Sequence, residues 1–127
     1  MVIKESAENY LESILMIRNE KGYVRSIDIA NELGFTKPSV SIAMKHFREE
    51  GYIIMDQDGA ITLTEKGLEI AERIYERHQI IAKALMRLGV DEEIAYEDSC
   101  KIEHDISDMS FSKVKEYLAK AEKDESK

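Results

Sequence analysis

Residues 26–50, SIDIANELGFTKPSVSIAMKHFREE, have the pattern of two helices joined by a tight turn. Ser26 is a candidate N-cap for a short first helix, and Gly34 stands where a helix commonly stops. Thr36 can cap the second helix, with Pro38 in its first turn, where proline is tolerated. The stretch therefore predicts a helix-turn-helix.

The segments on either side extend this prediction. Residues 6–20 place Ala7, Leu11, Ile14 and Leu15 on one face at helical spacing. After the helix pair, two β-type runs at residues 52–55 and 60–64 flank an Asp-Gly turn, which is typical of a hairpin. Helix, short helix, turn, helix and hairpin is the order of a winged helix-turn-helix.

The second half of the chain is predicted to be helical. A long helix over residues 64–88 has an apolar stripe, and Gly89 follows it. Further helices are expected from Asp91 to about Ser107 and over residues 110–120. The fold class is thus mainly α. We expect a winged-helix DNA-binding domain over residues 1–65, a helical dimerisation and metal-binding domain over 66–122, and a frayed tail over 123–127.

Composition narrows the class of protein. The chain has 127 residues and a net charge of −8, with no apolar run near the roughly 20 residues that span a bilayer. The N-terminus has no apolar stretch of signal-peptide type. The single cysteine cannot form an internal disulfide, so a reducing, cytoplasmic compartment and no membrane partner are expected.

The acidic net charge argues against nucleic-acid binding, but the charge is unevenly distributed. Residues 36–48 contain Lys37, Lys45, His46 and Arg48 and no acidic residue. In a winged helix this second helix enters the major groove of double-stranded DNA. The candidate DNA-binding residues, which can reach phosphates, base edges or thymine methyl groups, are Thr36, Lys37, Pro38, Ser39, Ser41 and Lys45.

An alternative is that this helix only supplies Val40, Met44 and Phe47 to a core, with its hydroxyl groups in solvent. The two interpretations are compatible, because a recognition helix also has an inner face. The ordered pattern over residues 6–64 favours DNA binding over a winged helix that binds protein.

A second cluster of reactive side chains lies at residues 100–104, CKIEH. On a helix, Cys100, Glu103 and His104 share one face, because they are three and four residues apart. A thiolate, a carboxylate and an imidazole together can bind a divalent transition metal. An isolated cysteine is more often a small buried hydrophobe. The apolar residues of this segment fall on a different face: Ile94, Ala95, Ile102 and Ile106.

Three residues elsewhere could complete such a site. His78 lies at the edge of the apolar stripe of the long helix, between Ile74 and Ile81, and is expected to point inward. It is either a core histidine or a ligand. Glu12 and Asn9 lie three apart on the first helix, where they are either solvated surface residues or ligands.

Four stretches resemble one family. ENYLESI (8–14), TKPSVS (36–41), LTEKGLEIAERIYERHQII (63–81) and LMRLGVDEEIAYEDSCKIEHDIS (85–107) are similar to the metal-dependent repressors of the diphtheria toxin repressor and manganese transport regulator family. The resemblance implies a homodimer that binds an operator when Fe(II) or Mn(II) is bound and represses genes of metal uptake. It implies the two-domain form, without the SH3-like domain of longer members. The implied ligands are Cys100, Glu103, His104, His78, Glu12 and Asn9.

The chain mixes two patterns of this family. Iron-type members have a cysteine like Cys100 but a methionine where Asn9 stands. Manganese-type members have glutamate and aspartate at those two positions, with a glutamate and a histidine like Glu12 and His78. The chain has Ala82 and Tyr96 where the ancillary site of iron-type members has a carboxylate and a histidine. The thiolate favours Fe(II) over Mn(II), and Zn(II) or Co(II) would also fit in vitro.

The expected mechanism is that the metal selects orientations in which the two recognition helices of a dimer match adjacent major grooves. The dimer interface is expected to include Ile94, Ile102, Ile106, Phe111 and Val114. One alternative function is a winged-helix regulator that senses a small organic effector or has no effector. In that case the CKIEH stretch has only a structural role. Another is a small metal-dependent hydrolase with Glu103 as base, but the sequence has no HExxH-type helix and no nucleophile beside a base.

Overall fold

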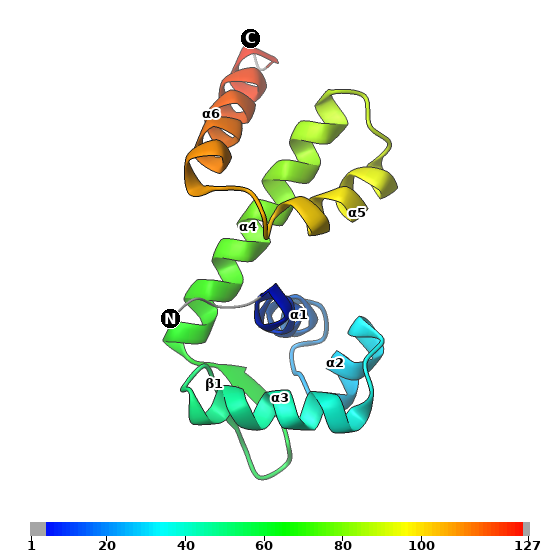
Figure 1. The fold of residues 1–127 in the computed structure, drawn as a ribbon, viewed down its shortest axis with the longest axis vertical. Coiled ribbons are helices and arrows are strands. Elements are labelled where there is room, and N and C mark those ends of the chain that lie inside the picture. The colour runs from blue at the N-terminus through cyan, green and yellow to red at the C-terminus, as the bar shows by residue number, and fades with distance from the viewer. Residues whose placement is uncertain (1–4, 126–127) are drawn as a thin grey trace. The chain divides into compact units, whose positions relative to one another are not determined.

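The computed structural model describes residues 5–125, which form six helices and one two-stranded hairpin (Figure 1). The chain divides into two compact units, Met1–Arg73 and Ile74–Lys127. The winged helix-turn-helix fold and the mainly helical class are confirmed. In chain order the elements are α1 (Glu5–Lys21), α2 (Ser26–Leu33), α3 (Lys37–Glu49), β1 (Ile53–Met55), β2 (Ile61–Leu63), α4 (Glu65–Arg87), α5 (Glu92–Ile102) and α6 (Asp108–Glu125).

The turn between α2 and α3 forms as the sequence predicts. Gly34 adopts a left-handed conformation, with φ of 70°, and its N–H donates to the carbonyl of Ala30 at 2.9 Å. Thr36 caps α3, because its hydroxyl accepts the N–H of Ser39 at 3.3 Å. The cap predicted for α2 is wrong: the N-cap is Arg25 and not Ser26, since the Asp28 carboxylate accepts the Arg25 N–H at 3.0 Å.

The core of the first unit lies where α1, α2, α3 and the hairpin meet. β1 and β2 pair antiparallel, with Ile53 opposite Leu63. The hairpin is fixed to the start of α4 at Gly67, where any side chain would collide with the carbonyl of Tyr52. The fully buried side chains of this unit include Leu11, Ile14, Val24, Ile29, Val40 and Met44.

The second unit consists of the rest of α4 with α5 and α6. The last helix runs in the same direction as α4, since Lys115 pairs with Glu76 at 2.9 Å and Glu125 pairs with Arg87 at 2.7 Å. This helix spans Asp108–Glu125, beyond the predicted 110–120. The preceding helix α5 ends at Ile102 and not near Ser107, because residues 103–107 form a turn.

Over the described residues, none of the helices is long and apolar enough to cross a bilayer.

Candidate metal centre and nucleic-acid interface

The second unit brings three of the predicted ligands together. His78 on α4, Cys100 on α5 and Glu103 just beyond α5 each have a donor atom within 4.8 Å of the other two. The Nδ1 atom of His78 lies 3.0 Å from Glu103 Oε2 and 3.5 Å from Cys100 Sγ. An imidazole from α4, a thiol from α5 and a carboxylate from the turn after α5 therefore lie close together.

Packing between α4 and α5 sets this arrangement. The hydroxyl of Ser99 donates to the carbonyl of His78 at 2.5 Å, and both residues are buried. Ser99 directly precedes Cys100, so this hydrogen bond holds the thiol-bearing turn of α5 against the imidazole. Tyr96 is also on α5, and the centre of its ring lies 5.4 Å from the centre of the His78 ring.

The neighbours of His78 in the cluster raise its pKa. Hydrogen bonding to Cys100, and then to Glu103, raises the pKa of His78 to about 10. The imidazole is therefore protonated at neutral pH, and its proton offsets the charge of the Glu103 carboxylate. A divalent metal ion that binds Nδ1 must displace this proton.

Glu103 is the residue that best tests whether a metal fits. Its side chain is 0% exposed, and a buried carboxylate is costly without a compensating charge. Within the described part of the chain, its Oε1 atom accepts no hydrogen bond, although His104 Nε2 is 3.3 Å away. A soft thiolate, an imidazole and a carboxylate with unused acceptor capacity fit a divalent transition metal.

The remaining predicted ligands lie in different places. The side chain of His104 is 2% exposed and faces Glu103, but it is in the turn after α5 and outside the group of three. Glu12 is buried and Asn9 is half-buried, and both are on α1 in the first unit. The predicted helix that carries Cys100, Glu103 and His104 ends at Ile102, so Glu103 and His104 lie in the turn that follows α5.

The predicted DNA-binding residues all lie on the exposed surface of α3 or at its cap. Val40, Met44 and Phe47 are buried, so this helix supplies them to the core and leaves the predicted DNA-binding residues on its exposed side. Lys45, His46 and Arg48 are exposed and give the C-terminal half of the helix a basic outer surface. Thr36 and Ser39 hydrogen-bond to each other at 2.9 Å, which fixes the cap.

Sequence reasoning missed Ile42 on the same helix. Its side chain is 61% exposed, although isoleucine is usually buried. It lies one turn from Pro38 and three residues from Lys45, so it shares their outer face. An apolar side chain there can contact a thymine methyl group. The available signal was that Ile42 falls outside the stripe of Val40, Met44 and Phe47.

Two residues behind the metal cluster were also missed. Arg77 and Ser99 are buried polar residues that bond to the backbone of the predicted ligands. Arg77 directly precedes His78, and Ser99 directly precedes Cys100. That adjacency is visible in the sequence, but the partners are carbonyl groups, which no side-chain pattern reveals.

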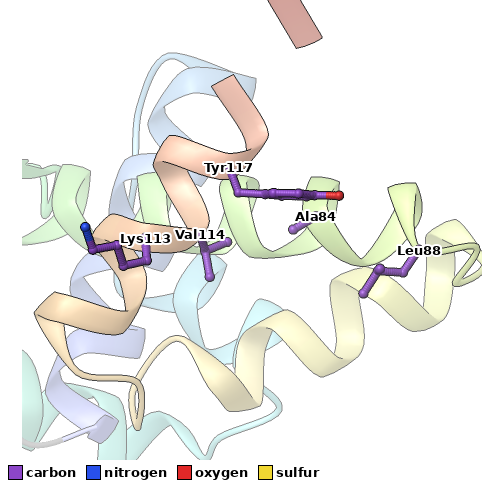
Figure 2. Close-up of a pocket in the computed structure, with 5 residues that line it drawn as sticks. All are labelled: Ala84, Leu88, Lys113, Val114 and Tyr117. Carbon is purple, nitrogen blue, oxygen red and sulfur yellow. The ribbon is translucent and has the colours of Figure 1, made fainter. Parts of the chain in front are cut away.

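A shallow apolar cavity of about 320 Å³ lies between α4 and α6. Figure 2 shows its lining, with Ala84 and Leu88 on one helix and Lys113, Val114 and Tyr117 on the other. Lys113 and Tyr117 are its only residues with ionisable groups, and no carboxylate or thiol lines it.

The expected dimer interface needs one correction. Ile94 and Ile102 are exposed, as an interface would need. Phe111, however, is buried inside its own unit, where the guanidinium of Arg77 stacks on its ring at 5.1 Å. It is therefore occupied by internal packing and cannot contact a partner.

Comparison with known proteins identifies both halves of the chain. Residues 3–61 match the family model described as iron dependent repressor, N-terminal DNA binding domain. Residues 64–127 match that described as iron dependent repressor, metal binding and dimerisation domain. The chain belongs to the iron-dependent repressor family. Members of this family are DNA-binding transcriptional repressors and not enzymes, so the chain is a metal-dependent transcriptional regulator.

Similar proteins agree with this family assignment. The HTH-type transcriptional regulator MntR of Bacillus velezensis is 36% identical over 122 residues, which is 96% of this repressor and 86% of the relative. MntR of Bacillus subtilis is 34% identical over the same shares of the two chains. The crystal structure of T. acidophilum IdeR superposes with a TM-score of 0.81 at 25% identity, over 94% of this chain but only 55% of that longer one.

Proposed function

We propose that this repressor responds to Fe(II) and that His78, Cys100 and Glu103 hold the ion. The observation that carries the proposal is the convergence of these three donors within 4.8 Å around a fully buried carboxylate. His104, Glu12 and Asn9 are proposed as further ligands. The buried side chains of His104 and Glu12 support that role, because a bound cation would offset their burial.

The thiol of Cys100 favours Fe(II) as the corepressor. Thiolates are soft ligands, and Mn(II) prefers oxygen donors, so a cysteine in the site raises the preference for Fe(II). The carboxylate of Glu103 makes Mn(II) the second choice. Zn(II) and Co(II) also suit a site with sulfur, nitrogen and oxygen donors and are expected to bind in vitro.

DNA contact is proposed for the outer face of α3. Lys37 and Lys45 are placed to neutralise phosphates, and the hydroxyl groups of Thr36, Ser39 and Ser41 can bond to phosphates or base edges. Pro38 and Ile42 would supply apolar contacts to thymine. In a homodimer the two α3 helices would contact adjacent major grooves of a two-fold operator.

Metal occupancy would favour the DNA-binding arrangement by population shift. A bound divalent cation would supply the positive charge that lets several buried donors share one site. Cys100, Glu103 and His78 would hold the ion, and His78 would lose its imidazole proton when the ion binds. Glu12 and Asn9 are on α1, so as ligands they would include the first unit in the response to metal. An ion shifts an equilibrium between two arrangements of the protein only if it binds one of them more tightly. Since the protein acts on chromosomal DNA and metal-uptake genes, we place it in the cytoplasm.

A metal-competition experiment tests the choice of ion. Anaerobic apo protein would be dialysed against buffered mixtures of Fe(II) and Mn(II), and the bound metals measured by elemental analysis. We expect the wild type to retain Fe(II) over Mn(II) and Cys100→Glu to show a smaller preference, because an oxygen donor replaces sulfur. Equal preference in the two proteins would contradict the role of Cys100.

His104→Ala completes the comparison. We expect this variant to lose metal affinity if His104 is a ligand. Wild-type affinity in His104→Ala would remove His104 from the ligand set and leave the other five proposed ligands.

A further inference from the structure

A buried arginine side chain lies beside the proposed metal ligands and is not one of them. Arg77 directly precedes His78 on α4, and it is 8% exposed. Arginine is rarely buried without partners that satisfy its five N–H donors. The contacts of its guanidinium group therefore need an explanation.

The partners of Arg77 are in the turn that follows α5. Its Nη1 atom donates to the carbonyl oxygen of Glu103 at 3.2 Å and to that of Ile106 at 2.9 Å. Its Nη2 atom donates to Asp108, at the start of α6, and the group stacks on the ring of Phe111. One side chain thus holds the turn and the start of the next helix.

The carbonyl contacts matter more than the ion pair. The side chain of Asp108 is 89% exposed, and ion pairs with a solvent-exposed partner contribute little. The carbonyl of Glu103, in contrast, is at the end of α5, where helix carbonyls lack intrahelical partners. Arg77 supplies partners for two carbonyls of the turn from one nitrogen, because the two N–H groups of Nη1 donate to Glu103 and to Ile106.

The residue held in this way is the one that carries the buried carboxylate. Glu103 caps α5, so its side-chain direction depends on the backbone of the turn. That backbone bonds to residue 77, and the carboxylate bonds to residue 78. Neighbouring residues of α4 therefore contact the two ends of Glu103.

We propose that Arg77 is a positioning residue for the metal site, holding the turn so that the Glu103 carboxylate stays beside His78 Nδ1. The inference rests on the proposed metal site and adds a residue that does not touch the ion. Partners of this kind, one shell out from the ligands, commonly change metal affinity by about 10–100-fold when removed.

The competing explanation is that Arg77 only stabilises the fold. Both explanations expect Arg77→Met to lower the melting temperature. Only the positioning role expects a changed coordination of a bound ion. Co(II) is a suitable probe, because its visible bands report the geometry of its ligands and its near-ultraviolet band reports thiolate binding.

The experiment is an anaerobic Co(II) titration of apo wild type, Arg77→Met, Arg77→Lys and Asp108→Asn, with apo thermal unfolding measured in parallel. We expect Arg77→Met to bind Co(II) about 10–100-fold more weakly. At saturation its visible bands should differ from wild type, while the thiolate band remains. Arg77→Lys should fall between, since its ammonium can still donate to a carbonyl but lacks the planar group that stacks on Phe111 and orients these donors. Asp108→Asn should match wild type in affinity and spectrum.

Wild-type affinity and bands in both Arg77 variants would overturn the proposal, whatever their stability. If Arg77→Met does not fold, Arg77→Lys gives the same decision alone. A wild-type protein that binds no Co(II) would overturn the proposed metal site together with this inference. Failure of Arg77 alone is thus distinguishable from failure of the site.

Discussion

Glu103 is the single residue that gives the most support to the proposed metal site. A carboxylate with no exposed surface is expensive to bury, and its only hydrogen bond in the described structure is with His78. The histidine is protonated there at neutral pH, with a pKa raised to about 10 by Cys100 and Glu103. A metal ion that binds His78 would have to replace this proton.

Lys45 provides a prediction for the DNA-binding surface. Lys45→Ala should weaken DNA binding about equally for all sequences, because a phosphate contact carries no base information. Each phosphate contact contributes about 0.9 to the slope of log affinity against log salt concentration. The slope of the variant, measured by fluorescence anisotropy at several salt concentrations, should therefore be smaller by about 0.9 per subunit.

Lys83→Ala is a matched control, since Lys83 is an exposed lysine of α4, outside the predicted DNA-binding set. An unchanged slope in Lys45→Ala would mean that this face of α3 does not contact the DNA backbone.

Single residues also show where sequence reasoning stopped. The spacing of Cys100 and Glu103 on one helix predicted that they would share a face, and they do. The same spacing placed His104 with them, and its Nε2 atom lies 3.3 Å from Glu103 Oε1, but α5 ends at Ile102 and His104 is in the turn that follows. That turn accepts a hydrogen bond from Arg77, which lies on another helix and is distant in sequence. Periodicity along one segment contains no information about such a partner.

At the scale of elements, the start of α2 gives a prediction about stability. Asp28 accepts the N–H of Arg25 and pairs with Lys21 at 3.0 Å. The hydrogen bond from Lys21 holds the pKa of Asp28 below its usual value. A lowered pKa stabilises the fold above the pKa of the unfolded chain, and this contribution is lost as pH falls through the folded pKa.

Asp28→Asn should therefore reduce the free energy of unfolding at pH 7, by about 0.5–1 kcal/mol for a weakened cap. Denaturant unfolding at pH 7 and at successively lower pH should show the difference from wild type shrinking as Asp28 becomes protonated. Asp58→Asn in the hairpin turn controls for a general effect of removing an exposed charge. A difference that does not depend on pH would contradict the role of the charge.

The elements themselves were largely predictable, and the reason is local. Gly34, Thr36 and the turn around Gly59 act through backbone conformation and capping within a few residues, so the helix pair and hairpin could be found from sequence. The true cap of α2 carried a local signal too, since Asp28 follows Arg25 by three residues. The sequence pattern favours Ser26 because serine is a much commoner N-cap than arginine.

For the whole molecule, the distribution of charge connects metal binding with DNA binding. The chain has a net charge of −8, yet the outer face of α3 is basic. DNA binding by such a protein is weakened by its overall charge, and a bound cation would reduce that repulsion. The group of His78, Cys100 and Glu103 lies in one unit of the fold and α3 lies in the other, so the intact chain is needed to test metal control of DNA binding.

The most direct test of metal control measures binding of the intact protein to a labelled fragment of its own upstream DNA. Fluorescence anisotropy would be recorded anaerobically for apo protein, after Fe(II), and after a chelator. The proteins compared would be wild type, Cys100→Ala, Glu103→Gln, and Glu97→Gln as a control at an exposed position of α5. Wild type and Glu97→Gln should bind more tightly with Fe(II) and return to the apo affinity with chelator, while Cys100→Ala and Glu103→Gln should not respond. DNA binding that ignores both metal and chelator, or an equal response in all four proteins, would contradict the account.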